Sequence, residues 1–203
     1  MSRPVVIVPT GTANTASVMA ALRRLGTEPR LAEGADDVMT ARRVVLPGVG
    51  TFGAAMSALA QMDIVETLAE RVSEGRPTLA VCVGMQLLGA GSEESDGLPG
   101  LGVIPARVSA FPTDLTVPQL GWNRVEPEMG CRFVEPGWAY FANSYRFPTP
   151  PQGWAAAVTE YGGSFVSALE RGDVLACQFH PELSGEWGSK LLDRWLTLTG
   201  GGR

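Results

Sequence analysis

The 203-residue chain has the length of one compact domain, and its 45% hydrophobic and 18% charged residues are ordinary for a globular protein. A net charge of −5 and the lack of a lysine or arginine cluster argue against binding to nucleic acid or an anionic membrane. No apolar run is long enough to span a bilayer, and the N-terminal apolar run is too short for a signal peptide. We therefore expect a cytoplasmic protein whose three cysteines are reduced.

Short apolar runs alternate with helical patterns through the first half of the chain. The sequence predicts strands at 4–9, 42–48 and 78–82, helices at 14–26 and 54–75, and a short helix from residue 84. This alternation predicts an α/β fold with a mostly parallel central sheet and flanking helices.

The second half has shorter segments that are richer in turns. Residues 98–180 predict hairpins that add an antiparallel extension to the sheet. A last helix is expected at 185–198, with Trp187, Leu191, Leu192, Trp195 and Leu198 facing the core. No internal repeat or linker divides the chain, so we expect a single domain over 1–203.

Cys82 lies between a predicted strand and a predicted helix, in the stretch TLAVCVGMQLL. A strand, a nucleophile and a close-packing glycine, here Gly84, form the layout of a nucleophile elbow, and a helix N-terminus favours a thiolate. Ala80 stands where that layout has its first glycine. A buried thiol at a strand end explains the same stretch, so this segment alone leaves both interpretations open.

His180 is the only histidine of the chain, and Glu182 follows it across Pro181. In an extended segment these two side chains project to one side, so the carboxylate can orient the imidazole while the other ring nitrogen faces a thiol. A simple capping segment before the last helix is the alternative. A single histidine and the lack of a C-x-x-C pair predict no metal site, and no cofactor is expected.

The loop VVLPGVGTFGAAM contains Gly48, Gly50 and Gly53, which match the spacing G-x-G-x-x-G. A dinucleotide site would also need an acidic residue about 20 positions further on, and that region is predicted helical. The loop is better interpreted as a source of N–H groups for an oxyanion.

Three motifs in order, P-G-V-G at 47–50, V-C-V-G-M-Q-L-L at 81–88 and Q-F-H-P-E at 178–182, resemble the class I (triad) glutamine amidotransferases. Within that family, PQLGWN at 118–123 and YFANSYRF at 140–147 look like the glutaminase subunits of imidazole glycerol phosphate synthase, which serve histidine biosynthesis. The resemblance covers most of residues 4–198.

The resemblance implies a glutaminase with a Cys82, His180 and Glu182 triad and oxyanion donors at Val83 and Val49. It implies a heterodimer with a (β/α)₈ cyclase subunit, which would receive the ammonia and form imidazole glycerol phosphate and aminoimidazole carboxamide ribotide. The residues that match substrate-binding positions are Gly50, Gln86, Glu94, Ser144 and Tyr145. The residues that match the partner interface are Asn14, Trp122, Asn123 and Tyr140.

The chain departs from the family at Asn143 and Gln119, which replace histidines, and at Leu183, which replaces a lysine expected at the partner interface. These changes concern partner contacts and activation and leave the triad intact. Two alternatives remain: a glutaminase of another amidotransferase, such as pyridoxal phosphate synthase, and a non-catalytic binding subunit.

Overall fold

The computed structural model describes residues 3–11 and 15–199 and contains a nine-stranded mixed sheet with the order β2-β1-β3-β4-β12-β11-β10-β7-β8. The first five strands in this order are parallel and the last four continue the sheet antiparallel. The parallel strands are β1 (Arg3–Ile7), β2 (Thr27–Leu31), β3 (Val44–Leu46), β4 (Thr78–Val81) and β12 (Val174–Cys177). The antiparallel strands are β7 (Gln119–Pro127), β8 (Gly137–Asn143), β10 (Ala155–Glu160) and β11 (Ser164–Arg171). The predicted parallel sheet with an antiparallel extension is confirmed.

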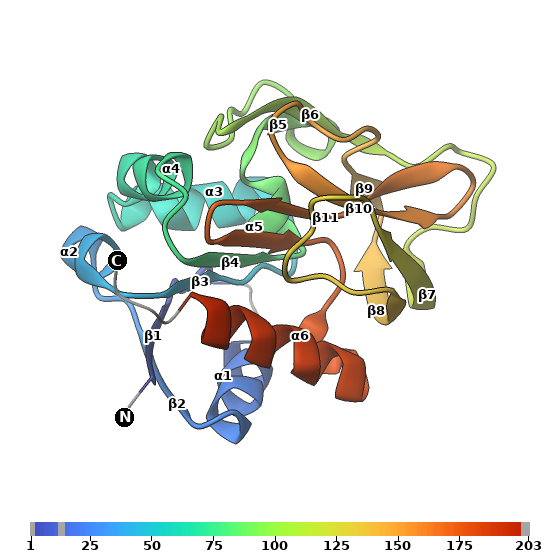
Figure 1. Ribbon diagram of the computed structural model, residues 1–203. Coiled ribbons are helices and arrows are strands. Elements are labelled where there is room, and N and C mark those ends of the chain that lie inside the picture. Colours follow the sequence, from blue (N-terminus) through green and yellow to red (C-terminus); the bar gives the residue numbers. More distant parts are fainter. Residues whose placement is uncertain (1–2, 12–14, 200–203) are drawn as a thin grey trace.

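Helices cover both faces of the parallel part of the sheet (Figure 1). The helices α3 (Phe52–Gln61) and α4 (Val65–Ser73) lie on one face, and α1 (Thr15–Arg24) and α6 (Gly185–Leu198) lie on the other. All residues of β3, β4 and β12 are buried, as expected for parallel strands between two helical layers. The remaining elements are short: α2 (Ala35–Thr40), α5 (Val83–Gln86), the 3₁₀ turns η1 (Glu93–Ser95) and η2 (Pro181–Leu183), and a small sheet of β5 (Gly89–Ser92), β6 (Ile104–Ala110) and β9 (Tyr145–Arg146).

The single helix predicted over 54–75 is wrong, because the structure has two helices there. The chain turns at Asp63, whose φ of 54° lies in the left-handed region, where aspartate is one of the few side chains tolerated. Ile64, which follows, is fully buried and is the N-cap residue of the second helix. Helical periodicity continues through both segments, so the pattern alone does not reveal the break.

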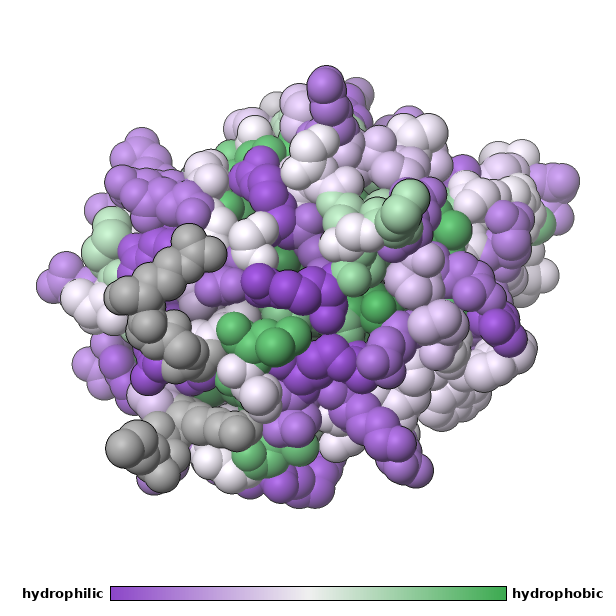
Figure 2. Space-filling view, viewed as in Figure 1, coloured by the Kyte–Doolittle hydropathy of each residue, from purple (hydrophilic) through white to green (hydrophobic). Residues whose placement is uncertain are grey.

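Two smaller differences concern the edge of the sheet and the last helix. The sequence did not predict the strand β2, because its residues TEPRL include charges and a proline rather than an apolar run. This composition is typical of an edge strand, and β2 pairs only with β1. In α6 the predicted core positions Leu191, Leu192 and Trp195 are buried, whereas Leu198 is half exposed. On the face seen in Figure 2, hydrophobic residues reach the surface in separate patches among hydrophilic ones.

Arg71 on α4 is completely buried and ties the parallel strands to the helices around them. Burial lowers the pKa of Arg71 to about 10, with a further contribution from the positive charge of Arg76, so the guanidinium remains charged at neutral pH. Its three nitrogens donate at 2.8–3.2 Å to the carbonyl oxygens of Val38, Ala41, Arg42 and Pro77 and to the hydroxyl of Thr78.

We expect Arg71→Met to lower the free energy of unfolding by about 3–5 kcal/mol, since it leaves several buried carbonyl oxygens without a donor. Denaturant unfolding followed by circular dichroism measures the change. Arg23→Met, on the exposed last turn of α1, is the matched control and should change stability by less than about 0.5 kcal/mol. Equal stability of the two variants would contradict the role given to Arg71.

Candidate active site

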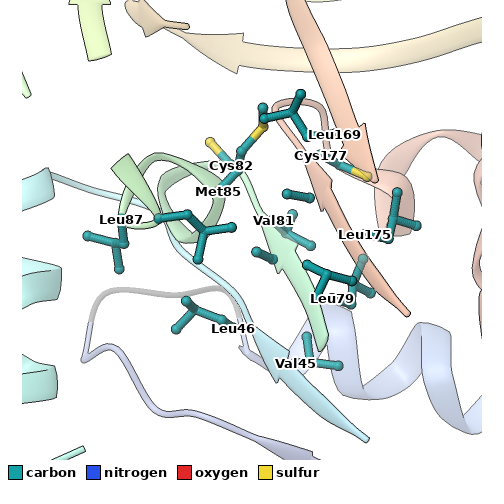
Figure 3. Close-up of a cluster of buried hydrophobic side chains, with 14 of the residues drawn as sticks. Val45, Leu46, Leu79, Val81, Cys82, Met85, Leu87, Leu169, Leu175 and Cys177 are labelled. Carbon is teal, nitrogen blue, oxygen red and sulfur yellow. The ribbon is translucent and has the colours of Figure 1, made fainter. Parts of the chain in front are cut away.

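Cys82 occupies a strained turn between β4 and α5, with φ 54° and ψ −112°. This region of backbone space is costly for a residue with a side chain, and it persists only where the surroundings impose it. The N–H of Cys82 donates to the carbonyl oxygen of Cys177 at 2.7 Å, which fixes the turn to the neighbouring strand β12. Figure 3 shows Cys82 at the end of β4, with Val81 and Leu79 along the strand that leads to it.

The two glycines predicted to matter here, Gly48 and Gly84, allow two segments of backbone to touch. A Cβ atom on Gly84 would lie 2.0 Å from the carbonyl oxygen of Leu46 at the end of β3. A Cβ atom on Gly48 would lie 2.5 Å from the backbone nitrogen of Gly84. Both distances are shorter than any real contact, so only glycine lets the loop after β3 pack against the turn at Cys82.

His180 and Glu182 lie beside this turn on the segment that follows β12. The Nδ1 atom of His180 is 2.9 Å from Oε1 of Glu182, and the two side chains are only 6% and 4% exposed. The backbone N–H of His180 donates to the carbonyl oxygen of Tyr140, and Ser184 joins the two segments, because its Oγ donates to the carbonyl oxygen of His180 and accepts from the N–H of Tyr140. The strand β8 therefore holds the histidine in place.

The pKa of His180 reflects this enclosure and its two neighbours. Burial lowers the pKa, but a hydrogen bond with the side chain of Cys82, a hydrogen bond with Glu182 and the charges of both groups outweigh it and raise the pKa to about 10. Because Nδ1 faces Glu182, the ring presents Nε2 to the thiol side. The arrangement favours a charged imidazolium at neutral pH.

A cavity of about 220 Å³ opens above Cys82 and His180. It is lined by residues from separate parts of the chain, and these include all the positions predicted to bind substrate or an oxyanion. Those positions are Val49, Gly50, Val83, Gln86, Glu94, Ser144 and Tyr145. The structure thus brings the predicted catalytic and substrate residues to one site, with Glu182 directly behind His180.

The predicted oxyanion donor Val83 is engaged in the structure. Its N–H donates to the carbonyl oxygen of Gly48 at 3.3 Å. Val49, the second predicted donor, lines the cavity beside it. The carbonyl oxygen of Gly48 occupies the place beside the N–H of Val83 where an oxyanion would bind. The loop at 48–50 must therefore move before the N–H of Val83 can donate to an oxyanion.

The N-terminus of α3 does not offer the free N–H groups that a dinucleotide phosphate would need. The N–H of Phe52 donates to Oε2 of Glu94 at 2.6 Å, and that of Gly53 donates to Oγ of Ser95 at 3.1 Å. The N–H of Ala54 is capped by Thr51 at 3.3 Å. The glycine spacing at 48–53 therefore serves close packing and a turn at Gly50, where φ is 89°.

The residues predicted at the partner interface do not all share one face. Trp122 on β7 and Tyr140 on β8 are register partners with their rings edge-to-face at 6.1 Å, and Trp122 is 54% exposed. Asn123 projects from the opposite face by strand alternation, and its Nδ2 donates to the carbonyl oxygen of Glu160 at 2.9 Å. Asn14 lies outside the described residues.

The departures from the family take defined positions in the structure. Asn143 lines the cavity and donates from Nδ2 to the carbonyl oxygen of Tyr145 at 3.0 Å. Gln119, its register partner on β7, is buried, and within the described residues neither end of its amide has a hydrogen-bond partner. Leu183 is 43% exposed next to the triad segment.

Gln178 is a site residue for which the sequence gave no separate role. It is fully buried, and its Nε2 lies 3.8 Å from Sγ of Cys82. It belongs to the Q-F-H-P-E motif two positions before His180, and that place in the motif was the only available signal. The carbonyl oxygen of Ala142, 4.0 Å from Sγ, was also not foreseen.

Comparison with known proteins agrees with this geometry. The family model described as "Glutamine amidotransferase class-I" matches residues 6–197. The chain belongs to the class I glutamine amidotransferase family. Its curated relatives include "Imidazole glycerol phosphate synthase subunit HisH" of Symbiobacterium thermophilum, 40% identical over 94% of this chain and 92% of that protein. The subunit of the same name from Escherichia coli K12 is 41% identical over 96% and 99%.

Solved structures show the same amidotransferase fold at low sequence identity. A structure titled "Crystal structure of glutamine amidotransferase" superimposes with a TM-score of 0.77 at 22% identity, covering 97% of this chain and 99% of that one. The "Structure of PurLQS from Thermotoga maritima" gives 0.76 at 17%, covering 98% and 99%. In the part of the chain that the structure describes, no helix is long and apolar enough to cross a membrane, and no cluster of metal-ligating side chains occurs.

The other two cysteines of this amidotransferase have environments that suppress reactivity. Burial raises the pKa of Cys131 to about 12, with Glu170 nearby adding to the effect. Complete burial raises the pKa of Cys177 well above its ordinary range, again with Glu170 and Glu182 contributing.

Gly84→Ala should lower the free energy of unfolding by more than about 3 kcal/mol, because the new Cβ collides with backbone rather than with a movable side chain. Thermal and denaturant unfolding measure the loss. Gly34→Ala is the matched control, since a Cβ there meets nothing within 4 Å and φ is extended. A well-folded Gly84→Ala protein as stable as Gly34→Ala would show that the close approach is not required.

The single histidine makes the pKa of His180 directly measurable by NMR titration of a tag-free protein. We expect the imidazolium to persist through neutral pH and to titrate near pH 10. Cys82→Ala removes a hydrogen bond and a negative charge that raise the pKa, so the midpoint should fall by at least about one unit. An unchanged midpoint would contradict the pairing of the two side chains.

Proposed function

We propose that this amidotransferase is the glutaminase subunit of an imidazole glycerol phosphate synthase and works in the cytoplasm as one domain in a heterodimer with a cyclase. The observation that carries the proposal is the meeting of Cys82 and His180 at one cavity, with Glu182 hydrogen-bonded to His180 behind it. The curated relatives, at 40% and 41% identity over nearly their whole length, supply the choice of reaction within the family.

The reaction begins with attack of the Cys82 thiolate on the side-chain amide carbon of glutamine. His180 then gives its Nε2 proton to the departing nitrogen, so ammonia leaves and a γ-glutamyl thioester remains on Sγ. The neutral imidazole next takes a proton from water, which attacks the thioester and releases glutamate. Glu182 keeps Nδ1 protonated and Nε2 directed at the reacting atoms.

The negative oxygen that forms at each attack needs two N–H donors. We assign these to Val83 and Val49. The bond from Val83 to the carbonyl oxygen of Gly48 must break for this, and rotation of the Gly48–Val49 peptide would replace that oxygen with an N–H. Glutamine itself is held by Gly50, Gln86, Glu94, Ser144 and Tyr145, which line the cavity around Cys82.

The ammonia must reach the cyclase without loss to water, so the partner has to dock beside the triad. We assign docking to an apolar face that comprises Leu120, Trp122, Trp138, Tyr140 and Leu183. Four of these side chains are 43–68% exposed, an unusual gathering of large apolar groups on one hairpin and the adjoining turn η2. Trp122, Trp138 and Tyr140 are of the residue types that anchor protein interfaces.

Cys82→Ala should abolish glutamine hydrolysis and glutamine-dependent synthesis by the complex while leaving synthesis from added ammonium salt intact. The variant removes the nucleophile without touching the cyclase. Cys131→Ala is the matched control and should keep the wild-type rate, because this thiol lies outside the cavity. Hydrolysis of glutamine by Cys82→Ala would rule out the assigned nucleophile.

Trp122→Glu should weaken the complex with the cyclase by at least about tenfold in Kd, because a charge is placed in the apolar face. Calorimetric titration of the cyclase subunit measures this. Leu31→Glu alters another half-exposed leucine on β2, at the opposite end of the sheet from β8, and should leave Kd unchanged. Equal weakening by both substitutions, or by neither, would place the partner elsewhere.

A further inference from the structure

Gln178 connects the predicted nucleophile to the predicted substrate-binding residue Gln86. The Nε2 atom of Gln178 lies 3.8 Å from Sγ of Cys82, within the longer range of hydrogen bonds to sulfur. Its Oε1 accepts a hydrogen bond from Nε2 of Gln86 at 3.0 Å. Gln86 is almost fully buried and Gln178 completely so, and therefore neither amide can exchange these partners for bulk water.

The direction of this hydrogen-bond chain is fixed at one end by Tyr145. Its backbone carbonyl oxygen can only accept, and Nε2 of Gln86 donates to it at 3.1 Å. The second proton on the same nitrogen goes to Oε1 of Gln178. The amide of Gln178 must then present its NH₂ group, and not its oxygen, toward Sγ of Cys82.

The same orientation has a consequence for the cavity. Both protons of Gln86 are used by Tyr145 and Gln178, so the group that Gln86 can offer to a ligand is its acceptor oxygen Oε1. Gln86 lines the cavity beside Cys82. A bound glutamine would accordingly find an acceptor for one of its own N–H groups at this wall.

We propose that Gln178 is a positioning residue for glutamine hydrolysis, which donates a hydrogen bond to the Cys82 thiolate and locks the Gln86 amide with its oxygen toward the substrate. This inference rests on the proposed function of Cys82 as the nucleophile. Gln178 contacts the nucleophile and a binding residue, and it acts on the substrate through both. Its N–H stabilises the charged sulfur and also restricts the direction of attack.

Few other groups around Sγ of Cys82 can stabilise a negative charge on the sulfur. The titratable groups near it are His180 from the segment after β12, Glu182 from η2, Glu94 from η1 and Tyr145 from β9. Only His180 carries positive charge among these, and the carbonyl oxygen of Ala142, 4.0 Å from the sulfur, cannot donate to it. The neutral donor of Gln178 therefore adds to the imidazolium in holding the thiolate.

The test is the pH dependence of Cys82 alkylation by iodoacetamide, read by mass spectrometry of the peptide that contains it. Cys131 and Cys177 do not interfere below pH 9, because burial raises the pKa of Cys131 to about 12 and that of Cys177 well above its usual range. Gln178→Met keeps the length of the side chain but has no N–H. We expect it to raise the midpoint of alkylation by about one pH unit.

Steady-state kinetics of the complex with the cyclase give a second readout. Gln178→Met should also raise the KM for glutamine at least about threefold, because Gln86 loses the acceptor that orients it. Gln178→Glu keeps an acceptor oxygen for Gln86 and replaces the NH₂ group that donates to sulfur with a carboxylate oxygen. It should therefore raise the alkylation midpoint while leaving this KM within about twofold of wild type.

Ser167→Ala is the matched control for a buried change at this position. Ser167 is fully buried on β11, and its backbone oxygen accepts from the N–H of Gln178, but its hydroxyl makes no contact with sulfur. The variant should leave both the midpoint and the KM unchanged. Thermal unfolding of each variant confirms that the comparison is made on folded protein.

The outcomes separate the inference from the function on which it rests. If Cys82 alkylates normally and its midpoint stays at the wild-type value in both Gln178 variants, the role of Gln178 is overturned. Equal shifts in Gln178→Met and Ser167→Ala would overturn it as well, since they would reflect general loss of packing. If glutamine is instead hydrolysed by Cys82→Ala protein, the proposed nucleophile itself fails.

Discussion

The site depends on the close contact between the loop after β3 and the strained turn at Cys82. That contact exists because Gly48 and Gly84 have no Cβ atoms, and because Cys82 adopts a left-handed backbone that directs its side chain into the cavity. The turn is held from the other side by the hydrogen bond from Cys82 to Cys177. Strain at one residue is thus maintained by packing on two neighbouring strands.

The topology explains why the cavity forms where it does. The strands β3, β4 and β12 are parallel, so their carboxyl ends meet at one edge of the sheet and deliver Gly48, Cys82 and His180 there. The opposite wall is formed by residues 142–145, which run from the end of β8 in the antiparallel extension to the start of β9 in the small sheet. The hairpin that forms this wall also carries the apolar face assigned to the cyclase.

The direction of the hydrogen bonds within the site is set by a few groups that can only accept. The carboxylate of Glu182 only accepts, so the histidine presents Nε2 to the thiol. The carbonyl oxygen of Tyr145 accepts from both Gln86 and Asn143, which orients two amides in the cavity wall. Asn143, at a position where the resemblance implies a histidine, is thus one of the two donors to this carbonyl.

Much of this arrangement could be predicted from the sequence, because the decisive signals are local. The apolar runs predicted three of the five parallel strands, β1, β3 and β4, and the only histidine two residues before a carboxylate singled out His180 and Glu182. The strand β2 was not predicted, and β12 lies within the segment 98–180 that was expected to be antiparallel, although it pairs parallel with β4. Other features depend on contacts between distant segments. The break at Asp63, the side of β7 from which Asn123 projects and the contact of Gln178 with sulfur are set by packing that periodicity does not encode.

The triad is assembled while the carbonyl oxygen of Gly48 accepts from the N–H of Val83, which we proposed as an oxyanion donor. The most direct measurement compares the rate of glutamine hydrolysis by this subunit alone with its rate in complex with the cyclase and the cyclase's ribonucleotide ligand. We expect a low rate alone and a rise of at least about 100-fold in the liganded complex, the scale set by one oxyanion donor. Full activity of the isolated subunit would show that the carbonyl oxygen of Gly48 does not block the oxyanion site.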